Sequence, residues 1–382
     1  MKIAYVIDSV LGGGAASPVA AVTRVLRNAG AHVEVFALER RDGLALPGML
    51  ADGLQVHVRE GGKSDQWAAY RWLSHELAAY QPTLIWTSLT RATVLGLLLG
   101  RRRTTPVVSW QHIDYLKPIK LRLTHALRKW PVMWVGDSDA ITALTAQRLD
   151  VPPERLACWP LFAADPDAPQ AQVWQPGQTL RMGSLGRLRA IKGYDVLMDA
   201  LALLKQRGFK APMPFEIAIA GEGSEREALI QKAQGAEFSG LNLVGFTNQP
   251  RDFLVGLHLY LQPSRGEGLC IGMHEAMQAG LPVIASKVGQ MHHTLEAGSS
   301  GWLVPPGDVN ALADALADAL GHPAQLAVMG QAARRRVLSR FSTTAFSEAG
   351  EAILERLHVQ GVLSSTDKFE RDNQKMMMKR HS

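Results

Sequence analysis

Cysteine is nearly absent from this chain: its 382 residues include only Cys158 and Cys270. Two cysteines cannot form the dense disulfide framework of a small secreted domain, so we expect a reducing compartment. Long apolar runs are also missing, because no stretch approaches the roughly 18 residues that a membrane-spanning helix needs. Residues 1–8 indicate a short strand broken by Asp8, not a secretion signal. We therefore expect a cytoplasmic protein.

The chain also lacks an extreme composition. Apolar residues make up 47% and charged residues 20%, and the formal net charge is +6. These values are those of an ordinary globular protein and argue against a disordered or fibrous one. The length exceeds one ordinary core and suits two domains of Rossmann size.

Strand-like and helix-like stretches alternate along the first half. Strands are expected at residues 4–7, 31–38, 55–58, 84–87, 107–111 and 133–136, and helices at 17–28, 66–80, 92–99 and 140–148. This alternation predicts a parallel, doubly wound sheet. Ligands of such sheets bind beyond the carboxyl ends of the strands, so Gly13, Gly14, Thr87, Ser88 and His112 are expected on one rim.

A second alternating series begins near residue 180. Its strands are expected at 180–185, 215–220, 241–244, 258–262 and 283–285, and its helices at 194–207, 309–320, 324–340 and 343–357. Residues 163–178 are rich in proline and glutamine, which is typical of a linker. We predict an α/β protein with two Rossmann-like domains, 1–165 and 179–340, a linker at 166–178, and a polar, disordered tail at 361–382.

The most informative stretch is residues 265–280. It follows a strand-like run, is rich in glycine at its start, and ends at Gly280 like a helix. A strand, a glycine turn and a helix point backbone N–H groups at an anion. Glu267 in the turn and Glu275 on the helix would need hydroxyl or ammonium donors there, which a nucleotide sugar would supply. The alternative is a pair of solvated acids, which the spacing alone would favour.

This stretch resembles the Glu-x7-Glu signature of retaining glycosyltransferases with the GT-B architecture, in glycosyltransferase family 4. The matching residues are Pro263-Ser264, Glu267-Gly268, Glu275-Ala276-Met277 and Gly280-x-Pro282-Val283. The resemblance implies that Glu267 lies by the donor sugar and that Glu275 accepts from ribose hydroxyls. It also implies that the N–H groups of Gly268, Leu269, Cys270 and Ile271 face the donor diphosphate. It covers roughly residues 1–358, and a last helix at 341–360 should return to the first domain.

Arg187 and Lys192 lie five residues apart across a turn that leads into a helix. Cations beside the positive end of a helix are unfavourable unless an anion joins them. The run resembles the Gly-Arg-Leu…Lys-Gly segment of the family, which implies that both cations clamp the donor diphosphate. Two solvated surface cations are the alternative. Later glycine turns, at Gly221 and at Gly245-Phe246, are implied to lie by the nucleotide and its base.

The first glycine turn, Gly12-Gly13-Gly14, allows two interpretations. A dinucleotide turn with Glu39 as the ribose acid is disfavoured, because three residues separate the strand from the glycines and the third glycine is missing. In the family, Gly13 and Gly14 would instead face the donor phosphates and the acceptor. His112 matches a family histidine near the donor sugar or acceptor, with a structural histidine as the equal alternative. Asp114 is a weaker candidate.

Two further patterns suggest partners. Asp137-Ser138-Asp139 could hold a divalent cation, as in transferases of the GT-A architecture, but a helix cap is favoured, so we expect no metal and no cofactor.

Residues 115–134 contain Lys117, Lys120, Arg122, Arg128 and Lys129, no acid, and interleaved apolar residues. This pattern predicts contact with an anionic membrane surface, peripheral on the inner face of the plasma membrane. A solvated helix that packs on the sheet is as well supported. A nucleic-acid patch is disfavoured because no such fold motif accompanies it.

Together these features predict a retaining hexosyltransferase that moves a sugar from a nucleotide donor to a lipid-linked, lipopolysaccharide or polysaccharide acceptor. A UDP-sugar is the favoured donor and GDP-mannose the alternative. Arg187, Lys192 and the glycine-turn N–H groups would stabilise the charge on the departing diphosphate. The competing hypotheses are a metal-dependent transferase that uses Asp137 and Asp139, a nicotinamide-linked oxidoreductase, and a non-catalytic sugar-nucleotide binder.

Overall fold

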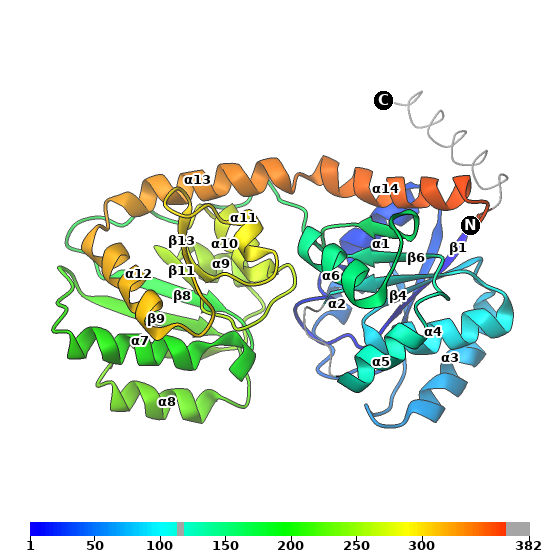
Figure 1. The fold of residues 1–382 in the computed structure, drawn as a ribbon, viewed down its shortest axis with the longest axis horizontal. Helices are drawn as coiled ribbons and strands as arrows, with labels where there is room; N and C mark the ends of the chain where they lie inside the picture. The colour runs from blue at the N-terminus through cyan, green and yellow to red at the C-terminus, as the bar shows by residue number, and fades with distance from the viewer. Residues whose placement is uncertain (113–117, 364–382) are drawn as a thin grey trace. The chain divides into compact units, whose positions relative to one another are not determined.

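The computed structural model describes residues 1–112 and 118–363, which form two compact units (Figure 1). The N-terminal unit comprises residues 1–161 together with the chain from Thr344 onward, and the C-terminal unit comprises residues 162–343. Asp114, Lys117 and the tail at 364–382, on which predictions were made above, lie outside the described residues.

The N-terminal unit contains a seven-stranded parallel sheet in the order β3-β2-β1-β4-β5-β6-β7. Its strands are β1 Lys2–Ile7, β2 His32–Ala37, β3 Gln55–Val58, β4 Leu84–Ser88, β5 Val107–Gln111, β6 Met133–Gly136 and β7 Leu156–Cys158. β1 pairs with both β2 and β4, so the strand order reverses between β1 and β4. In a doubly wound sheet this reversal is where ligands bind.

Seven helices accompany this sheet in the described part of the unit. They are α1 Val19–Asn28, α2 Leu46–Ala51, α3 Gln66–Tyr80, α4 Thr90–Arg103, α5 Pro118–Ala126, α6 Asp139–Leu149 and α14 Thr343–Val359. Beneath α14 the rings of Trp110 and Trp159 stack with centroids 4.8 Å apart. A Cβ on Gly350 of α14 would come within 2.4 Å of the Trp159 ring, so only glycine lets this helix pack so closely.

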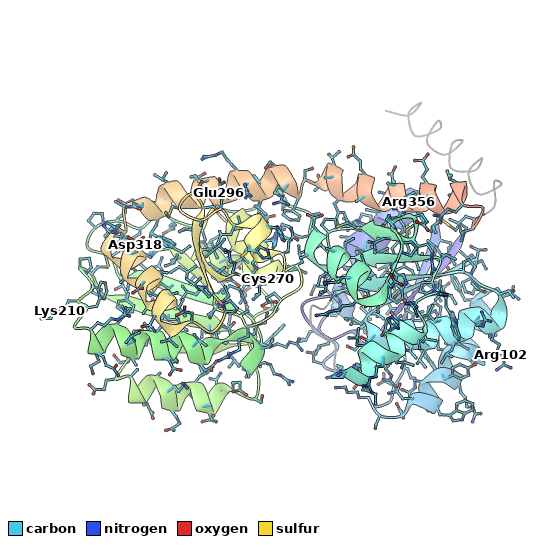
Figure 2. All side chains as sticks on the ribbon, in the orientation of Figure 1. Arg102, Lys210, Cys270, Glu296, Asp318 and Arg356 are labelled. Atoms are coloured by element: carbon cyan, nitrogen blue, oxygen red, sulfur yellow. The ribbon has the colours of Figure 1, made fainter. Side chains whose placement is uncertain are left out.

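The last helix therefore returns to the N-terminal unit, as Figure 1 also shows. Arg356 of α14, labelled in Figure 2, fixes it there by donating to the backbone oxygen of Leu156 at 2.9 Å.

The C-terminal unit repeats the same topology with six parallel strands in the order β10-β9-β8-β11-β12-β13. The strands are β8 Leu180–Leu185, β9 Phe215–Ala220, β10 Leu241–Gly245, β11 Leu259–Gln262, β12 Val283–Ser286 and β13 Gly301–Val304. The helices are α7 Tyr194–Gln206, α8 Arg226–Gly235, α9 Pro250–Val255, α10 Ile271–Gln278, α11 Met291–Thr294, α12 Val309–Gly321 and α13 Gln325–Arg340. Here the strand order reverses between β8 and β11.

The predicted fold class is confirmed: both units are doubly wound parallel sheets. Several strands have the predicted bounds, because strands buried on both faces are continuous apolar runs. Helix α4 is longer than expected and ends at Arg103, because its last turn is a polar, arginine-rich one. The short strand β7 was not expected from the sequence.

The proline- and glutamine-rich segment at 163–178 is attached to the C-terminal unit. The backbone N–H of Asp165 donates to Gln278 Oε1 at 2.7 Å, and that of Ala171 donates to the backbone oxygen of Ala279 at 2.7 Å. The division between the units accordingly falls after Leu161. Across the described ranges, no helix combines the length and apolarity that crossing a bilayer would require.

Candidate active site

The glycine turn of the C-terminal unit lies between β11 and α10. Cys270, labelled in Figure 2, has a left-handed backbone (φ 64°) and precedes α10 without a side-chain cap. None of the N–H groups of Gly268, Leu269, Cys270 and Ile271 finds an acceptor among the described residues. Leu269 and Cys270 are buried, so these N–H groups are costly to leave unpaired. Unpaired N–H groups at the start of a helix are the arrangement that favours an anion.

Three donors converge on one oxygen of Glu267. Lys192 Nζ donates to Oε1 at 2.6 Å, Ser264 Oγ at 2.6 Å and Gln262 Nε2 at 3.0 Å. The Glu267 side chain is only 10% exposed. Within residues 1–112 and 118–363, Oε2 has no hydrogen-bond partner. Oε1 is therefore fully engaged in fixing the carboxylate, and Oε2 keeps its capacity to accept hydrogen bonds.

The orientation of the Gln262 amide follows from its neighbours. Tyr260 OH donates to Gln262 Oε1 at 2.9 Å, so the NH2 group faces Ser264 and Glu267. Tyr260 in turn accepts from the backbone N–H of Leu185 at 3.1 Å. Gln262 was not predicted as a site residue, and Ser264 was expected only as part of the motif match. The available signal was the spacing of Tyr260, Gln262 and Ser264, because alternate residues of a strand share one face.

Lys192 reaches Glu267 because two loops approach closely. Gly193 has φ 68°, and a Cβ there would lie 1.9 Å from the backbone oxygen of Pro263. Burial is the largest single influence and disfavours the charged ammonium, but the charge and hydrogen bond of Glu267, together with Cys270 and Tyr194, outweigh it and raise the pKa of Lys192 above its usual value. An ammonium has three donors, and Glu267 uses one. Arg187, the other predicted cation, is exposed in the loop after β8.

The turn after β12 supports the glycine turn from its other side. Gly289 has φ 52°, and a Cβ there would lie 2.1 Å from the backbone oxygen of Glu267. The N–H of Gln290 donates to the backbone oxygen of Gly268 at 2.9 Å. Gly289 is therefore required both by its backbone conformation and by the close contact.

Glu275 lies on α10 and is half-buried. Burial raises the pKa of its carboxyl group to about 7, and the charge of Arg251 only partly opposes this. In the part of the chain that the structure describes, this carboxylate has no hydrogen-bond or ion-pair partner. A ligand that offers hydroxyl donors would favour the charged form.

The other predicted nucleotide-binding glycines meet at the ends of neighbouring strands. Gly221 forms a β-bridge with Gly245, and a Cβ on Gly221 would lie 2.0 Å from the backbone oxygen of Gly186. Phe246 follows as an exposed aromatic ring. The structure thus brings together the loops that follow β8, β9 and β10.

In the N-terminal unit, His112 lies at the end of β5 between two polar side chains. Its Nε2 shares a 2.8 Å hydrogen bond with Ser88 Oγ. Its Nδ1 lies 3.3 Å from Asp137 Oδ2, an ion-pair distance without hydrogen-bond alignment. The side chains of His112 and Asp137 are almost fully buried. Asp137 was not predicted to act with His112, because their contact depends on β5 and β6 being neighbours.

The Asp-x-Asp pattern forms a helix start, as the favoured interpretation predicted. Ser138 Oγ caps α6 by accepting from the N–H of Ile141 at 3.3 Å. Asp137 faces His112, whereas Asp139 Oδ1 accepts from the Cys158 thiol at 3.7 Å. The two carboxylates therefore have different partners. The described residues contain no group of three or more His, Cys, Asp or Glu side chains that could hold a metal ion.

Gly13 and Gly14 also lie in the N-terminal unit. Both have positive φ, 90° and 48°, and an added Cβ would meet no atom within 4 Å. Their backbone conformation, and not crowding, favours glycine here. The N–H of Gly13 donates to Ser17 Oγ at 3.1 Å. Glu39, the ribose acid of the dinucleotide alternative, instead pairs with Arg41 at 3.1 Å.

Both units match sequence models of known families. Residues 12–161 match the family described as Glycosyltransferase Family 4, and residues 179–322 match the family described as Glycosyl transferases group 1. The two matches lie in the N-terminal and C-terminal units, respectively.

Two curated relatives are similar over part of the chain. The amylovoran biosynthesis glycosyltransferase AmsK of Erwinia amylovora is 35% identical over 190 residues, 47% of this chain and 46% of the relative. The putative colanic acid biosynthesis glycosyltransferase WcaL of Salmonella typhimurium is 30% identical over 219 residues, 54% of this chain and 52% of the relative. The matched region therefore spans about half the length of these relatives.

Two solved structures share the fold over almost the whole chain. HepE of Anabaena, solved in complex with UDP-glucose, has a TM-score of 0.80 and 20% identity, and the match covers 93% of this chain and 100% of that one. Sucrose-phosphate synthase from Thermosynechococcus elongatus has a TM-score of 0.77 and 18% identity, over 94% and 100% of the two chains. At these identities the similarity establishes the fold alone.

Proposed function

Because this chain belongs to glycosyltransferase family 4, we propose that it transfers a sugar, with retention, from a nucleotide-sugar donor to a polysaccharide, lipopolysaccharide or lipid-linked acceptor in the cytoplasm. One observation carries the proposal. The fixed carboxylate of Glu267, with Oε2 unengaged, adjoins the unpaired N–H groups that start α10. Hydroxyl donors and a diphosphate on one ligand would satisfy both.

Cleavage of the donor leaves negative charge on the departing diphosphate. The N–H groups of Gly268 to Ile271 and the two remaining donors of the Lys192 ammonium would stabilise that charge without rearranging. Arg187 would add a second cation. These groups would take the part that a divalent cation plays in other transferases. We expect transfer to persist in EDTA, and its loss there would contradict this part of the proposal.

Glu267 and Glu275 would bind the hydroxyl groups of the donor. Oε2 of Glu267 would accept from the sugar and stabilise positive charge at the anomeric carbon. Glu275 would accept from the ribose, because its half-buried carboxylate has no protein donor among the residues described. Gly221, Gly245 and Phe246 would line the nucleoside. In the N-terminal unit, Gly13, Gly14 and His112 would contact the donor phosphates, the sugar or the acceptor.

A UDP-sugar is the proposed donor and GDP-mannose the alternative. HepE was solved with UDP-glucose, and AmsK and WcaL carry the names of polysaccharide biosynthesis enzymes. Thermal-shift measurements against UDP-, GDP- and ADP-sugars test the donor, since a ligand at 100 times its Kd stabilises the fold by about 2.7 kcal/mol. We expect the largest shift with a UDP-sugar. No shift with any of them would refute the proposal, and binding without release of nucleoside diphosphate would indicate a non-catalytic binder.

We also propose that α5 touches an anionic membrane surface. Its described residues carry Lys120 and Arg122, and Ile119, 78% exposed, and Leu123 lie one helical turn apart in contact with solvent. Exposed apolar residues among cations bind anionic lipid. We expect binding to phosphatidylglycerol vesicles that falls when Ile119 and Leu123 become Ser and when Lys120 and Arg122 become Gln. Equal binding to phosphatidylcholine vesicles would contradict this.

A further inference from the structure

A tryptophan is exposed at the start of α3 and stacks on a partly buried tyrosine. Trp67 is 70% exposed and stacks on Tyr70 with ring centroids 5.5 Å apart and planes 10° apart. The helix does not need Trp67 for its packing. The residues that anchor α3 to the core of the unit are Ala69, Leu73, Leu77 and Tyr80, all buried. Trp67 therefore presents a large apolar ring to solvent without a stabilising role in this core.

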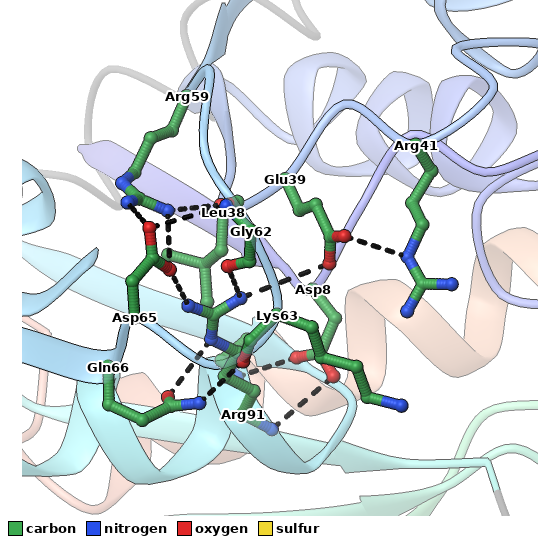
Figure 3. Close-up of polar contacts among 11 residues, drawn as sticks. Asp8, Leu38, Glu39, Arg41, Arg59, Gly62, Lys63, Asp65, Gln66 and Arg91 are labelled. Carbon is green, nitrogen blue, oxygen red and sulfur yellow. Dashed lines mark hydrogen bonds and ion pairs between the residues drawn. The ribbon is translucent and has the colours of Figure 1, made fainter. Parts of the chain in front are cut away.

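This aromatic pair lies at the ligand-binding edge of the sheet. α3 follows the loop that leaves the carboxyl end of β3. The preceding residue, Gln66, accepts from Arg91 Nε through Oε1 at 3.0 Å. The backbone N–H groups of Arg91 and Ala92 donate to Asp8 at 3.4 and 2.7 Å. Asp8 follows β1 and Arg91 follows β4, so these contacts connect the first turn of α3, which carries Trp67, to the point where the strand order reverses (Figure 3).

The loop before Trp67 is held rigidly. Figure 3 shows Asp65 between two guanidinium groups: Arg59, which is buried, and Arg91, whose Nη2 donates to Asp65 Oδ1 at 3.2 Å. The N–H of Gly62 also donates to Asp65 Oδ2 at 3.2 Å. A Cβ on Gly61 would come within 2.4 Å of the Arg59 guanidinium, so this backbone lies directly against it. The stacked pair is thus preorganised, which lowers the entropy cost of binding.

We infer that Trp67 and Tyr70 form a subsite that stacks against a sugar ring of the acceptor glycan. This inference rests on the proposed function, which requires a glycan acceptor. A pyranose ring has a flat face of C–H groups, which an exposed aromatic ring can cover, and a rim of hydroxyl groups, which need polar partners. Lys63 and Arg71 are exposed on either side of Trp67 in the sequence, and among the described residues neither forms an ion pair. Arg71 lies one turn from Trp67 on the same helix face.

The test measures binding to an array of defined oligosaccharides of two to six sugars. The variants are Trp67→Ala, Trp67→Phe, which keeps an aromatic ring, and Val328→Ala, a control at a residue 71% exposed on α13. We expect the wild type, Trp67→Phe and Val328→Ala to bind the same glycans. Trp67→Ala should bind them at least tenfold more weakly and raise the KM for the acceptor while kcat stays unchanged.

Equal glycan binding by Trp67→Ala, or no glycan bound by the wild type at 1 mM, would overturn the inference. Loss of binding to phosphatidylglycerol vesicles by Trp67→Ala, with glycan binding intact, would overturn it in favour of a membrane contact. The thermal shift with UDP-sugars separates the two proposals, because most of the proposed donor residues lie in the other unit and neither Trp67 nor Tyr70 is among them. If that shift occurs but Trp67→Ala binds glycans as tightly as the wild type, only the inferred subsite is refuted. If no nucleotide sugar causes a shift, the proposed function fails and the acceptor role of the subsite fails with it, whereas glycan binding that depends on Trp67 still supports the stacking of a sugar ring at this site.

Discussion

The ion pair between Lys192 and Glu267 gives the sharpest prediction. Lys192→Met leaves the carboxylate of Glu267, which is 10% exposed, with only two neutral donors, and Glu267→Gln leaves the ammonium without an anion. Breaking a fully buried pair costs about 3–5 kcal/mol. Lys192 is 19% exposed and Glu267 keeps Ser264 and Gln262, so we expect each single variant to lose about 2–3 kcal/mol of unfolding free energy. The double variant should recover most of that loss, because no uncompensated charge remains.

Turnover should respond differently from stability. If Lys192 stabilises the departing diphosphate, its loss should cost about 3 kcal/mol of transition-state stabilisation, or roughly a hundredfold in kcat. The double variant should be no more active than either single variant, because it lacks both the ammonium for the diphosphate and the carboxylate for the sugar, even though its stability is restored.

The assay pairs urea unfolding with a coupled measurement of nucleoside diphosphate release. Arg265→Met is the matched control, because Arg265 lies in the same loop and pairs with Asp195 at 2.6 Å on the surface. Exposed pairs contribute about 0–1 kcal/mol, so this variant should keep nearly full stability and activity. If kcat returns in the double variant along with stability, the pair is structural and the proposed mechanism is wrong.

Three further predictions follow from the same geometry. Because the pKa of Glu275 is raised to about 7, its protonated carboxyl group contributes stability that is fully present below pH 4.5 and is lost as the pH rises through 7. The free energy of unfolding of the wild type, measured by urea titration, should therefore fall by about 2–3 kcal/mol relative to that of Glu275→Gln between pH 5 and 8. A difference that stays constant with pH would contradict this. Gly289→Ala should abolish the thermal shift with UDP-sugars, because its Cβ would collide with the turn at Glu267 and Gly268. The control Gly298→Ala, at φ 78° with no atom within 4 Å of the added Cβ, should lose only about 1 kcal/mol of stability and keep the shift. Equal behaviour of the two variants would show that Gly289 does not support the donor site. Asp137→Asn should lower kcat by about tenfold or more, because it removes the charge beside the buried ring of His112, while the UDP-sugar shift persists. An unchanged kcat would show that Asp137 is merely structural.

The fold was largely predictable because local chemistry determines it. Parallel strands buried on both faces are apolar runs bounded by glycine turns, and alternation with helices leaves few topologies. Ser138 and Asp308 cap α6 and α12 as their residue types suggest. The segment at 163–178 was harder to assign, because composition indicates a lack of regular structure but does not reveal which unit its N–H groups bond to.

The candidate site was only partly predictable because it depends on strand order. Lys192 and Glu267 lie 75 residues apart and meet because β8 pairs with β11, which aligns the loops that follow these strands. The contact between His112 and Asp137 likewise depends on β5 pairing with β6. Motifs identified both glutamates and Lys192, but only the sheet order places them relative to one another.

The proposed mechanism requires that fixed groups of the C-terminal unit bind the nucleoside diphosphate. A crystal structure of the protein with UDP would show whether they do. We expect the diphosphate to lie against the N–H groups of Gly268 to Ile271 and beside Lys192, with the ribose hydroxyls donating to Glu275. UDP bound instead at the Gly13-Gly14 turn of the N-terminal unit, with the α10 N–H groups unoccupied, would contradict it.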